Sequence, residues 1–318
     1  METPEFSSSS DTPSVTEPKR LPWIFQNERG LRAGWRLVIY VGSVAAAWIG
    51  CMMLVNEFVH PEREAYSPWV LGVGEFVSFA VAFGAAWMMS RLEERSPAAY
   101  GLPLRGAFGK LFWLGCLVGL CEVSALVALI AAFGGYSFGE LALHGQALVN
   151  MCVSWAILFV LVGLFEEFLF RGYTQFTLAE GIGFWPAAVL LSVAFGMVHR
   201  KNAGEGWAGV ASVIVIGLVF CFALKRTGNL WFCVGLHAAF DFGETFLYSV
   251  PNSGVMFEGH LSNASLHGPL WLSGGSIGPE GSVFSFVTMG IVALAIHVMF
   301  PARAKESAEQ EPAAASAA

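Results

Sequence analysis

Charged residues are scarce in this chain of 318 residues. Asp, Glu, Lys and Arg together form 13% of the sequence, whereas hydrophobic residues form 55%. Soluble globular proteins carry about 25% charged residues, so this composition excludes an ordinary soluble domain and predicts a polytopic membrane protein. The net charge is -7, and no basic patch with interleaved aromatic residues occurs, which argues against nucleic acid as a partner.

The N-terminal segment lacks the apolar core of a cleavable signal peptide. The first 20 residues are rich in Ser, Thr, Pro and Glu, and no apolar run begins before Arg36, so we expect no signal peptide. Residues 1–33 are expected to form a polar, disordered cytoplasmic tail with an interfacial end, and residues 301–318 a second disordered tail. The six cysteines lie in apolar runs without metal-ligand spacing and are interpreted as small core hydrophobes.

Eight apolar runs are long enough, or nearly so, to cross about 30 Å of hydrocarbon. They predict an all-α bundle of about eight transmembrane helices, near residues 37–55, 69–90, 111–133, 148–168, 184–199, 208–224, 230–248 and 282–300. When the N-terminus is placed in the cytoplasm, most Lys and Arg residues outside these runs fall on the cytoplasmic side, with Arg63, Arg200 and Lys201 as exceptions. The positive-inside rule therefore predicts that both termini are cytoplasmic.

One integral membrane domain is expected over residues 34–300, with its candidate chemistry in residues 148–248. Residues 249–281 contain no Lys or Arg and are rich in glycine, which predicts an ordered or semi-ordered external loop. No internal repeat at a fixed period is visible, which argues against an inverted-repeat transporter.

Two carboxylates and a guanidinium follow one of the most apolar runs, as Glu166, Glu167 and Arg171. Each charge costs about 2.5–3.5 kcal/mol near the centre of a bilayer, which indicates a functional site that faces the protein interior. Successive helical residues turn by about 100°, so Glu167 and Arg171 share a face and Glu166 points elsewhere. We therefore predict that Glu167 pairs with Arg171 and that Glu166 is the reactive carboxylate. The alternative is a helix end at the membrane interface, with the arginine snorkelling to lipid headgroups.

Two histidine motifs follow in later apolar runs. Phe195 and His199 lie one helical turn apart at the end of a run, where a lone histidine is more often interfacial than catalytic. His237 and Asp241 have the same spacing inside another run, and Asp241 is expected to hydrogen-bond the imidazole and fix its tautomer. An ionisable pair inside a membrane span indicates function.

Together these motifs supply a carboxylate, two imidazoles and an orienting acid on three different spans. Such a set suits activation of a water by general base catalysis and stabilisation of the oxyanion formed when that water attacks an amide. Glu166, His199 and His237 would also suit a catalytic Zn²⁺ with an open position. However, the sequence contains no H-E-x-x-H helix motif, so a metal is permitted without being required.

The ordered motifs Glu166-Glu167-x-x-x-Arg171, Phe195-x-x-x-His199 and His237-x-x-x-Asp241 resemble the CAAX protease and bacteriocin-processing family. These are intramembrane glutamate proteases that include the type II CaaX prenyl endopeptidases, and the resemblance covers about residues 148–248. It implies that Glu166 activates the attacking water, and that Glu167 and Arg171 shape the site. It also implies that His199 and His237 hold the water and polarise the scissile carbonyl.

Asp241 occupies a position where members of this family often have Asn. An ionised carboxylate cannot donate a hydrogen bond to an oxyanion, so the orienting role for His237 is the one that we expect of Asp241. The flanking sequences resemble prokaryotic members, which implies an integral protein of the inner membrane.

The leading hypothesis is therefore an intramembrane endopeptidase that acts on membrane-associated or lipidated peptides. The alternatives are a non-catalytic scaffold or immunity-type protein that binds a partner in the same cavity, and, third, a transporter. Simple alternation of the spans would separate Glu166 from His199 by much of the membrane. Because residues 149–180 form one mostly apolar stretch, a long fourth helix, together with a short fifth, is expected to bring them together through tilted or offset helices.

Overall fold

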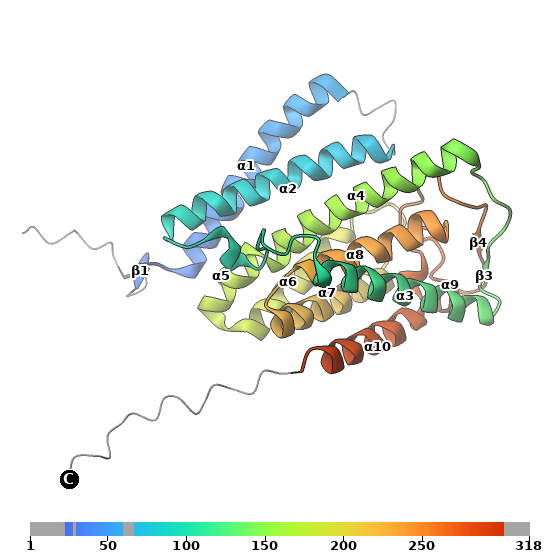
Figure 1. Cartoon of the computed structure of the whole chain (residues 1–318). Helices are drawn as coiled ribbons and strands as arrows, with labels where there is room; N and C mark the ends of the chain where they lie inside the picture. Colours follow the sequence, from blue (N-terminus) through green and yellow to red (C-terminus); the bar gives the residue numbers. More distant parts are fainter. Residues whose placement is uncertain (1–22, 28–29, 60–66, 302–318) are drawn as a thin grey trace, which may run out of the picture.

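The protein is a bundle of α-helices, as a computed structural model shows for residues 23–27, 30–59 and 67–301 (Figure 1). The all-α membrane bundle predicted from the apolar runs is confirmed. Its helices are α1 (Ala33–Val59), α2 (Pro68–Leu92), α3 (Lys110–Ala132), α4 (Gly145–Arg171), α5 (Tyr173–Ile182), α6 (Phe184–His199), α7 (Trp207–Thr227), α8 (Trp231–Phe242), α9 (Leu270–Ser273) and α10 (Val283–Met299).

Each of the eight predicted spans coincides with one helix, although their lengths differ. Five helical segments are long and apolar enough to cross a membrane, and α6 and α10 are shorter apolar helices. The short α8 continues directly into a π-helical turn, Gly243–Leu247. Of the predicted tails, 1–33 and 301–318, residues 1–22 and 302–318 lie outside the described residues, as does Arg63. The end of the N-terminal tail is not disordered as predicted, because residues 26–27 and 30–31 pair as two short strands.

The apolar stretch of 38 residues that includes α4 is not one continuous helix. Helix α4 ends at Arg171, and Gly172, with φ −83° and ψ −120°, separates it from α5. A Cβ at this position would overlap the carbonyl oxygen of Phe168, so only glycine allows the chain to turn there. The expectation of a single long fourth helix is therefore corrected to two helices.

Helices α3 and α8 pack with their backbones in contact. A Cβ added at Gly119 of α3 would overlap the carbonyl oxygen of Leu236, and a Cβ added at Gly235 of α8 would overlap that of Phe112. Small residues are the usual means by which membrane helices approach this closely. The contact places α8, which carries His237, in the centre of the bundle (Figure 1).

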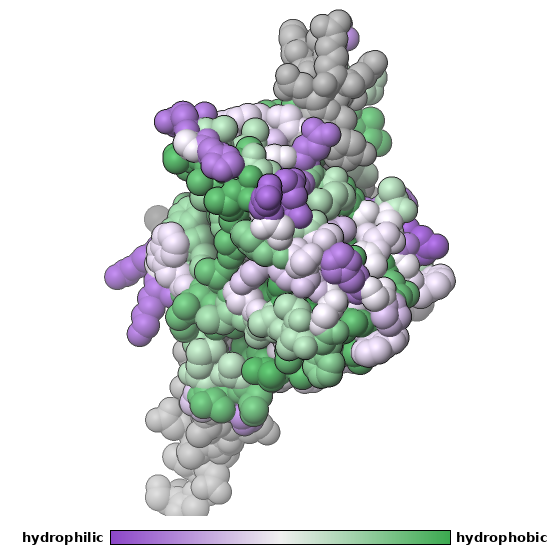
Figure 2. Space-filling view, turned by 90° about the vertical axis from the view of Figure 1, so that its right-hand side faces the viewer, coloured by the Kyte–Doolittle hydropathy of each residue, from purple (hydrophilic) through white to green (hydrophobic). Residues whose placement is uncertain are grey.

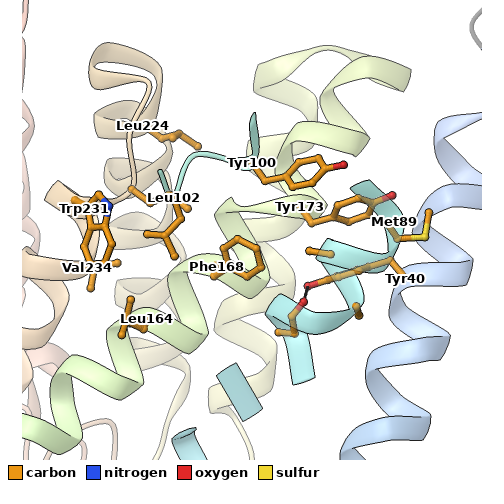
Figure 3. Packing of buried hydrophobic residues seen from close by; sticks show 14 of the residues in the cluster. Tyr40, Met89, Tyr100, Leu102, Leu164, Phe168, Tyr173, Leu224, Trp231 and Val234 are labelled. Carbon is orange, nitrogen blue, oxygen red and sulfur yellow. Dashed lines mark hydrogen bonds between the residues drawn. The ribbon is translucent and has the colours of Figure 1, made fainter. Parts of the chain in front are cut away.

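A buried hydrophobic cluster fixes the rotation of α4 (Figure 3). Phe168 is fully buried, and its ring lies 5.5 Å from that of Phe83 on α2. In the same cluster the rings of Tyr40 and Tyr173 lie 4.3 Å apart and join α1 to α5. Glu167, about 100° farther round the helix, is fully buried as well, so α4 is enclosed by the bundle on more than one face at this level.

Helix α1 is attached to the bundle mainly near its beginning. Arg36 forms ion pairs with Glu93, at 2.6 Å, and with Glu180. Farther along the helix, Met53 and Leu54 are exposed, and only 6% of the apolar window of α1 is buried in the bundle. Such an apolar surface suits contact with lipid.

Loops cover one end of the bundle. Strand β3 (Tyr136–Ser137) pairs with β4 (Ser265–Leu266) beside α9 at this end, and a second short pair, β1 (Gln26–Asn27) and β2 (Gly30–Leu31), lies at the opposite end (Figure 1). The loop of residues 249–281 is ordered through hydrogen bonds such as Gly254 N to Ile277 O, at 2.8 Å. Hydrophilic and near-neutral residues spread over this end, with hydrophobic patches beside them (Figure 2).

The six cysteines are free, as the sequence interpretation expected. Cys221 and Cys233 are buried, whereas Cys121 is exposed on α3. The interpretation of every cysteine as a core residue is therefore wrong for Cys121, because helical spacing places its side chain on the outer face of α3.

Candidate active site

Glu166 lies close to both histidines of the predicted motifs. Its Oε2 atom is 3.7 Å from Nε2 of His237 and 4.0 Å from Nε2 of His199. The three side chains come from α4, α8 and α6, respectively. The short α6 ends at His199, so its terminal residue reaches the level of Glu166, which occurs five residues before the end of α4. The three polar atoms thus surround one small space.

Glu167 lies at the centre of a buried charge network. Its side chain is fully buried, and its Oε1 atom is 3.1 Å from Nη1 of Arg171 and 2.9 Å from Nδ1 of His237. The i, i+4 spacing predicted the first contact, whereas the second joins residues 70 positions apart. A carboxylate that accepts a hydrogen bond at Nδ1 leaves Nε2 of His237 to face Glu166.

Asp241 lies beside His237, at the i, i+4 spacing that the sequence indicated. Its Oδ2 atom is 3.4 Å from Nε2 of His237, the same nitrogen that faces Glu166. At the other nitrogen, Nδ1 of His237 donates a hydrogen bond to Oε1 of Glu167, and this shorter contact of 2.9 Å orients the ring.

Aromatic rings surround the buried guanidinium of Arg171. Its Cζ atom is 4.1 Å from the ring centroid of Phe195 and 5.2 Å from that of Phe220. Arg171 is fully buried, so these cation–π contacts act in a desolvated environment, where they are strongest. The ring of Phe220 also stacks on that of His237, at 5.4 Å, so one aromatic side chain packs against two residues of the site.

The backbone orients His199. Its Nδ1 lies 2.9 Å from the carbonyl oxygen of Phe195, one helical turn earlier. Because a carbonyl only accepts hydrogen bonds, Nδ1 carries a proton, and in the neutral ring Nε2 is the free acceptor that faces Glu166. The Phe195-x-x-x-His199 spacing therefore places the carbonyl oxygen of Phe195 where it accepts a hydrogen bond from the His199 ring.

Four further acidic residues near the site were not singled out from the sequence. Glu75 of α2 lies within electrostatic range of Glu166 and His237, and its Oε2 atom is buried without a hydrogen-bond partner. Glu122 of α3, Glu244 of the π-helical turn and Glu280 lie near Asp241. Glu75 and Glu122 are lone acids inside apolar runs, so the high energetic cost of intramembrane charge was the signal that could have identified them.

The donor atoms lie slightly farther apart than the ligands of a tetrahedral metal ion. Among the residues that the structure describes, no group of three or more His, Cys, Asp or Glu side chains is arranged to hold one. Two ligands on a tetrahedral zinc lie about 3.4 Å apart, given zinc–ligand distances of about 2.1 Å, whereas Oε2 of Glu166 lies 3.7 and 4.0 Å from the two Nε2 atoms.

One comparison with known proteins gives a match. Residues 148–243 match the family model described as type II CAAX prenyl endopeptidase Rce1-like. This segment includes all six residues predicted for the site, from Glu166 to Asp241. No curated protein and no solved structure matches the chain. The resemblance drawn from the three motifs is confirmed by the family model.

Proposed function

We propose that this chain, whose residues 148–243 match the model of the type II CAAX prenyl endopeptidase Rce1-like family, is an intramembrane endopeptidase that uses a water activated by Glu166. The family supports a membrane protease in general. The observation that carries the finer proposal is the convergence of the Glu166 carboxylate with Nε2 of His199 and of His237. Its substrates are peptide bonds of membrane-associated or lipidated peptides.

The proposed reaction begins with a water held between Glu166 and the two imidazoles. Glu166 accepts a proton from this water as the oxygen attacks the carbonyl carbon of the scissile amide. The resulting tetrahedral oxyanion is stabilised by a histidine that donates a hydrogen bond. When the carbon–nitrogen bond breaks, the proton on Glu166 passes to the departing amine, which regenerates the carboxylate.

Glu167 and Arg171 act as positioning residues in this proposal. The hydrogen bond that Glu167 accepts from Nδ1 fixes the orientation of the His237 ring, and Arg171 balances the charge of Glu167 in a space without solvent. Asp241 lies 3.4 Å from Nε2 of His237, where its carboxylate can accept a hydrogen bond from that nitrogen when the nitrogen carries a proton.

The test is cleavage of a quenched fluorescent peptide by the purified protein in lipid vesicles. Glu166→Gln keeps the size of the side chain but removes the base, and we expect a loss in kcat of at least about 100-fold. Glu140→Gln, a change at an exposed loop residue, is the matched control and should retain full activity. Cleavage by Glu166→Gln at the wild-type rate would refute the proposal. A biological effect that persists in this variant would instead favour the non-catalytic scaffold.

We also propose that both termini are cytoplasmic and that the protein lies in a prokaryotic inner membrane. The distribution of Lys and Arg along the sequence supports this orientation. Single cysteines placed in the two tails of a cysteine-free variant should react with a membrane-impermeant maleimide only after the cells are opened. Labelling of either tail in intact cells would contradict the orientation.

A further inference from the structure

A small cavity adjoins the histidines of the proposed active site. It has a volume of about 50 Å³ and is lined by His199, His237 and Asp241, together with Glu122 and Glu280. Glu166 is not among its lining residues, so the cavity is distinct from the space between Glu166 and the two Nε2 atoms. Its walls are otherwise mainly apolar and include Phe220, Leu236, Phe240 and Met289.

Asp241 lies beside His237, but the other two acidic residues of this cavity, Glu122 and Glu280, have no ion pair with Lys or Arg among the described residues. Glu122 is 96% buried, and neither of its carboxylate oxygens has a hydrogen-bond partner. Glu280 accepts hydrogen bonds from the backbone and hydroxyl of Ser253, and the fully buried Glu244 lies within electrostatic range of both acids. No Lys or Arg occurs among the described residues that line the cavity.

A buried acid without a partner is energetically costly, and a cation or a strong hydrogen-bond donor removes this cost. Arg171, a fully buried cation nearby, is already paired with Glu167. An ammonium group that entered the cavity from outside the fold would supply the partner that both oxygens of Glu122 lack. Its carbon chain would contact the apolar walls while its charged end reaches the acids, as the side chain of lysine does elsewhere.

The size of the cavity restricts the class of ligand. Because a buried water needs about 10–15 Å³ in this measure of volume, a cavity of about 50 Å³ holds about three to five groups of that size. The four methylenes and the nitrogen of a lysine side chain are five such groups, whereas arginine ends in a larger, planar guanidinium.

We propose that this cavity is a specificity pocket for an unbranched primary ammonium, and that it receives the side chain of a lysine next to the scissile bond. This inference rests on the proposed peptidase function, because a substrate bound at Glu166 would extend past the two histidines into the cavity. Glu122 and Glu280 would be the residues that recognise the ammonium group.

The first test uses two series of peptides. In one series the residue before the cleaved bond is lysine, arginine or norleucine, and in the other series the residue after that bond is varied in the same way. At one of the two positions we expect kcat/KM to be at least about tenfold higher for lysine than for norleucine, with arginine below lysine. Glu122→Gln should reduce the lysine-to-norleucine ratio toward one. Glu258→Gln removes an exposed acid from the same loop as Glu280 and should leave the ratio unchanged. Equal cleavage of lysine and norleucine peptides at both positions would overturn the pocket.

The second test does not depend on cleavage. Butylammonium chloride, a mimic of the lysine side chain, should raise the thermal unfolding temperature of the wild-type protein more than 1-butanol does, and Glu122→Gln should abolish this difference. If the wild-type protein cleaves no peptide, the proposed function fails, and the butylammonium result decides the pocket alone. Equal effects of the two compounds, or equal effects on wild type and variant, would refute the ammonium pocket.

Discussion

Glu167 has two roles: it compensates the buried charge of Arg171, and it orients the ring of His237. Substitutions at Glu167 and Arg171 separate these two roles. The substitution Glu167→Gln keeps the size of the side chain but leaves the guanidinium of Arg171, which is fully buried, without its carboxylate partner at 3.1 Å. Removal of one member of a buried ion pair costs about 3–5 kcal/mol, because the remaining charge is uncompensated. We expect a loss of this size in the free energy of unfolding.

A double-mutant cycle supplies the control. Arg171→Met also removes the charge, and the double variant Glu167→Gln/Arg171→Met has neither charge to bury. We expect the double variant to be more stable than Glu167→Gln alone, with a coupling energy of about 1–3 kcal/mol. Its peptidase activity should nevertheless stay low, because the negative charge at Nδ1 of His237 is lost in both variants.

The measurement is reversible unfolding in mixed micelles, followed by tryptophan fluorescence, combined with the peptide cleavage assay. A Glu167→Gln variant destabilised by less than about 1 kcal/mol would show that the pair is not effectively desolvated. Additive effects of the two substitutions would refute the pairing, and full recovery of activity in the double variant would refute the positioning role.

Three further predictions concern other parts of the molecule. Gly119→Ala should destabilise the protein by about 1–3 kcal/mol, measured by the same unfolding assay, because its Cβ overlaps the carbonyl oxygen of Leu236; a neutral effect would contradict the close packing of α3 on α8. Burial, together with the nearby Glu280 carboxylate, raises the pKa of Glu205 above its ordinary value of 4.5. The stability from Glu205 should therefore be complete below pH 4.5 and decline as the pH rises through the raised pKa. Glu205→Gln should flatten this part of the pH profile of the unfolding temperature, and an unchanged profile would refute the assignment. Peptide cleavage should survive dialysis against EDTA, because the proposed base is the Glu166 carboxylate and general base catalysis needs no metal; a loss that added Zn²⁺ restores would contradict this expectation.

The positions of the helices were predictable because lipid imposes a simple requirement on the sequence. A membrane-crossing helix needs a long apolar run, and each of the eight predicted runs lies in a helix. The break at Gly172 was not predicted, because apolarity alone does not distinguish one long helix from two helices joined by a turn. The overlap of a Cβ with the Phe168 carbonyl is a property of the packed chain.

The candidate site was partly predictable for a related reason. Local spacing on one helix predicted the contact of Glu167 with Arg171, whereas the contact of Glu167 with His237 links α4 to α8 and depends on how the helices pack. Spacing on one helix also placed Asp241 beside His237, but which nitrogen of the ring it faces depends on how the helices pack. Only the packing of the helices shows that Glu75 and Glu122 are neighbours of the site.

The contrast between α8 and α1 determines where the bundle can open. Helices α3 and α8 touch through their backbones at Gly119 and Gly235. A change of side-chain rotamer cannot separate them, so His237 lies on a helix that is held firmly in place. Helix α1 has the opposite character, since the ion pairs of Arg36 tie its beginning to the bundle while the exposed Met53 and Leu54 lie on its free part. The far part of α1 is therefore the part of the bundle that can move with the smallest loss of buried contacts, whereas any movement of α8 would break its packing against α3.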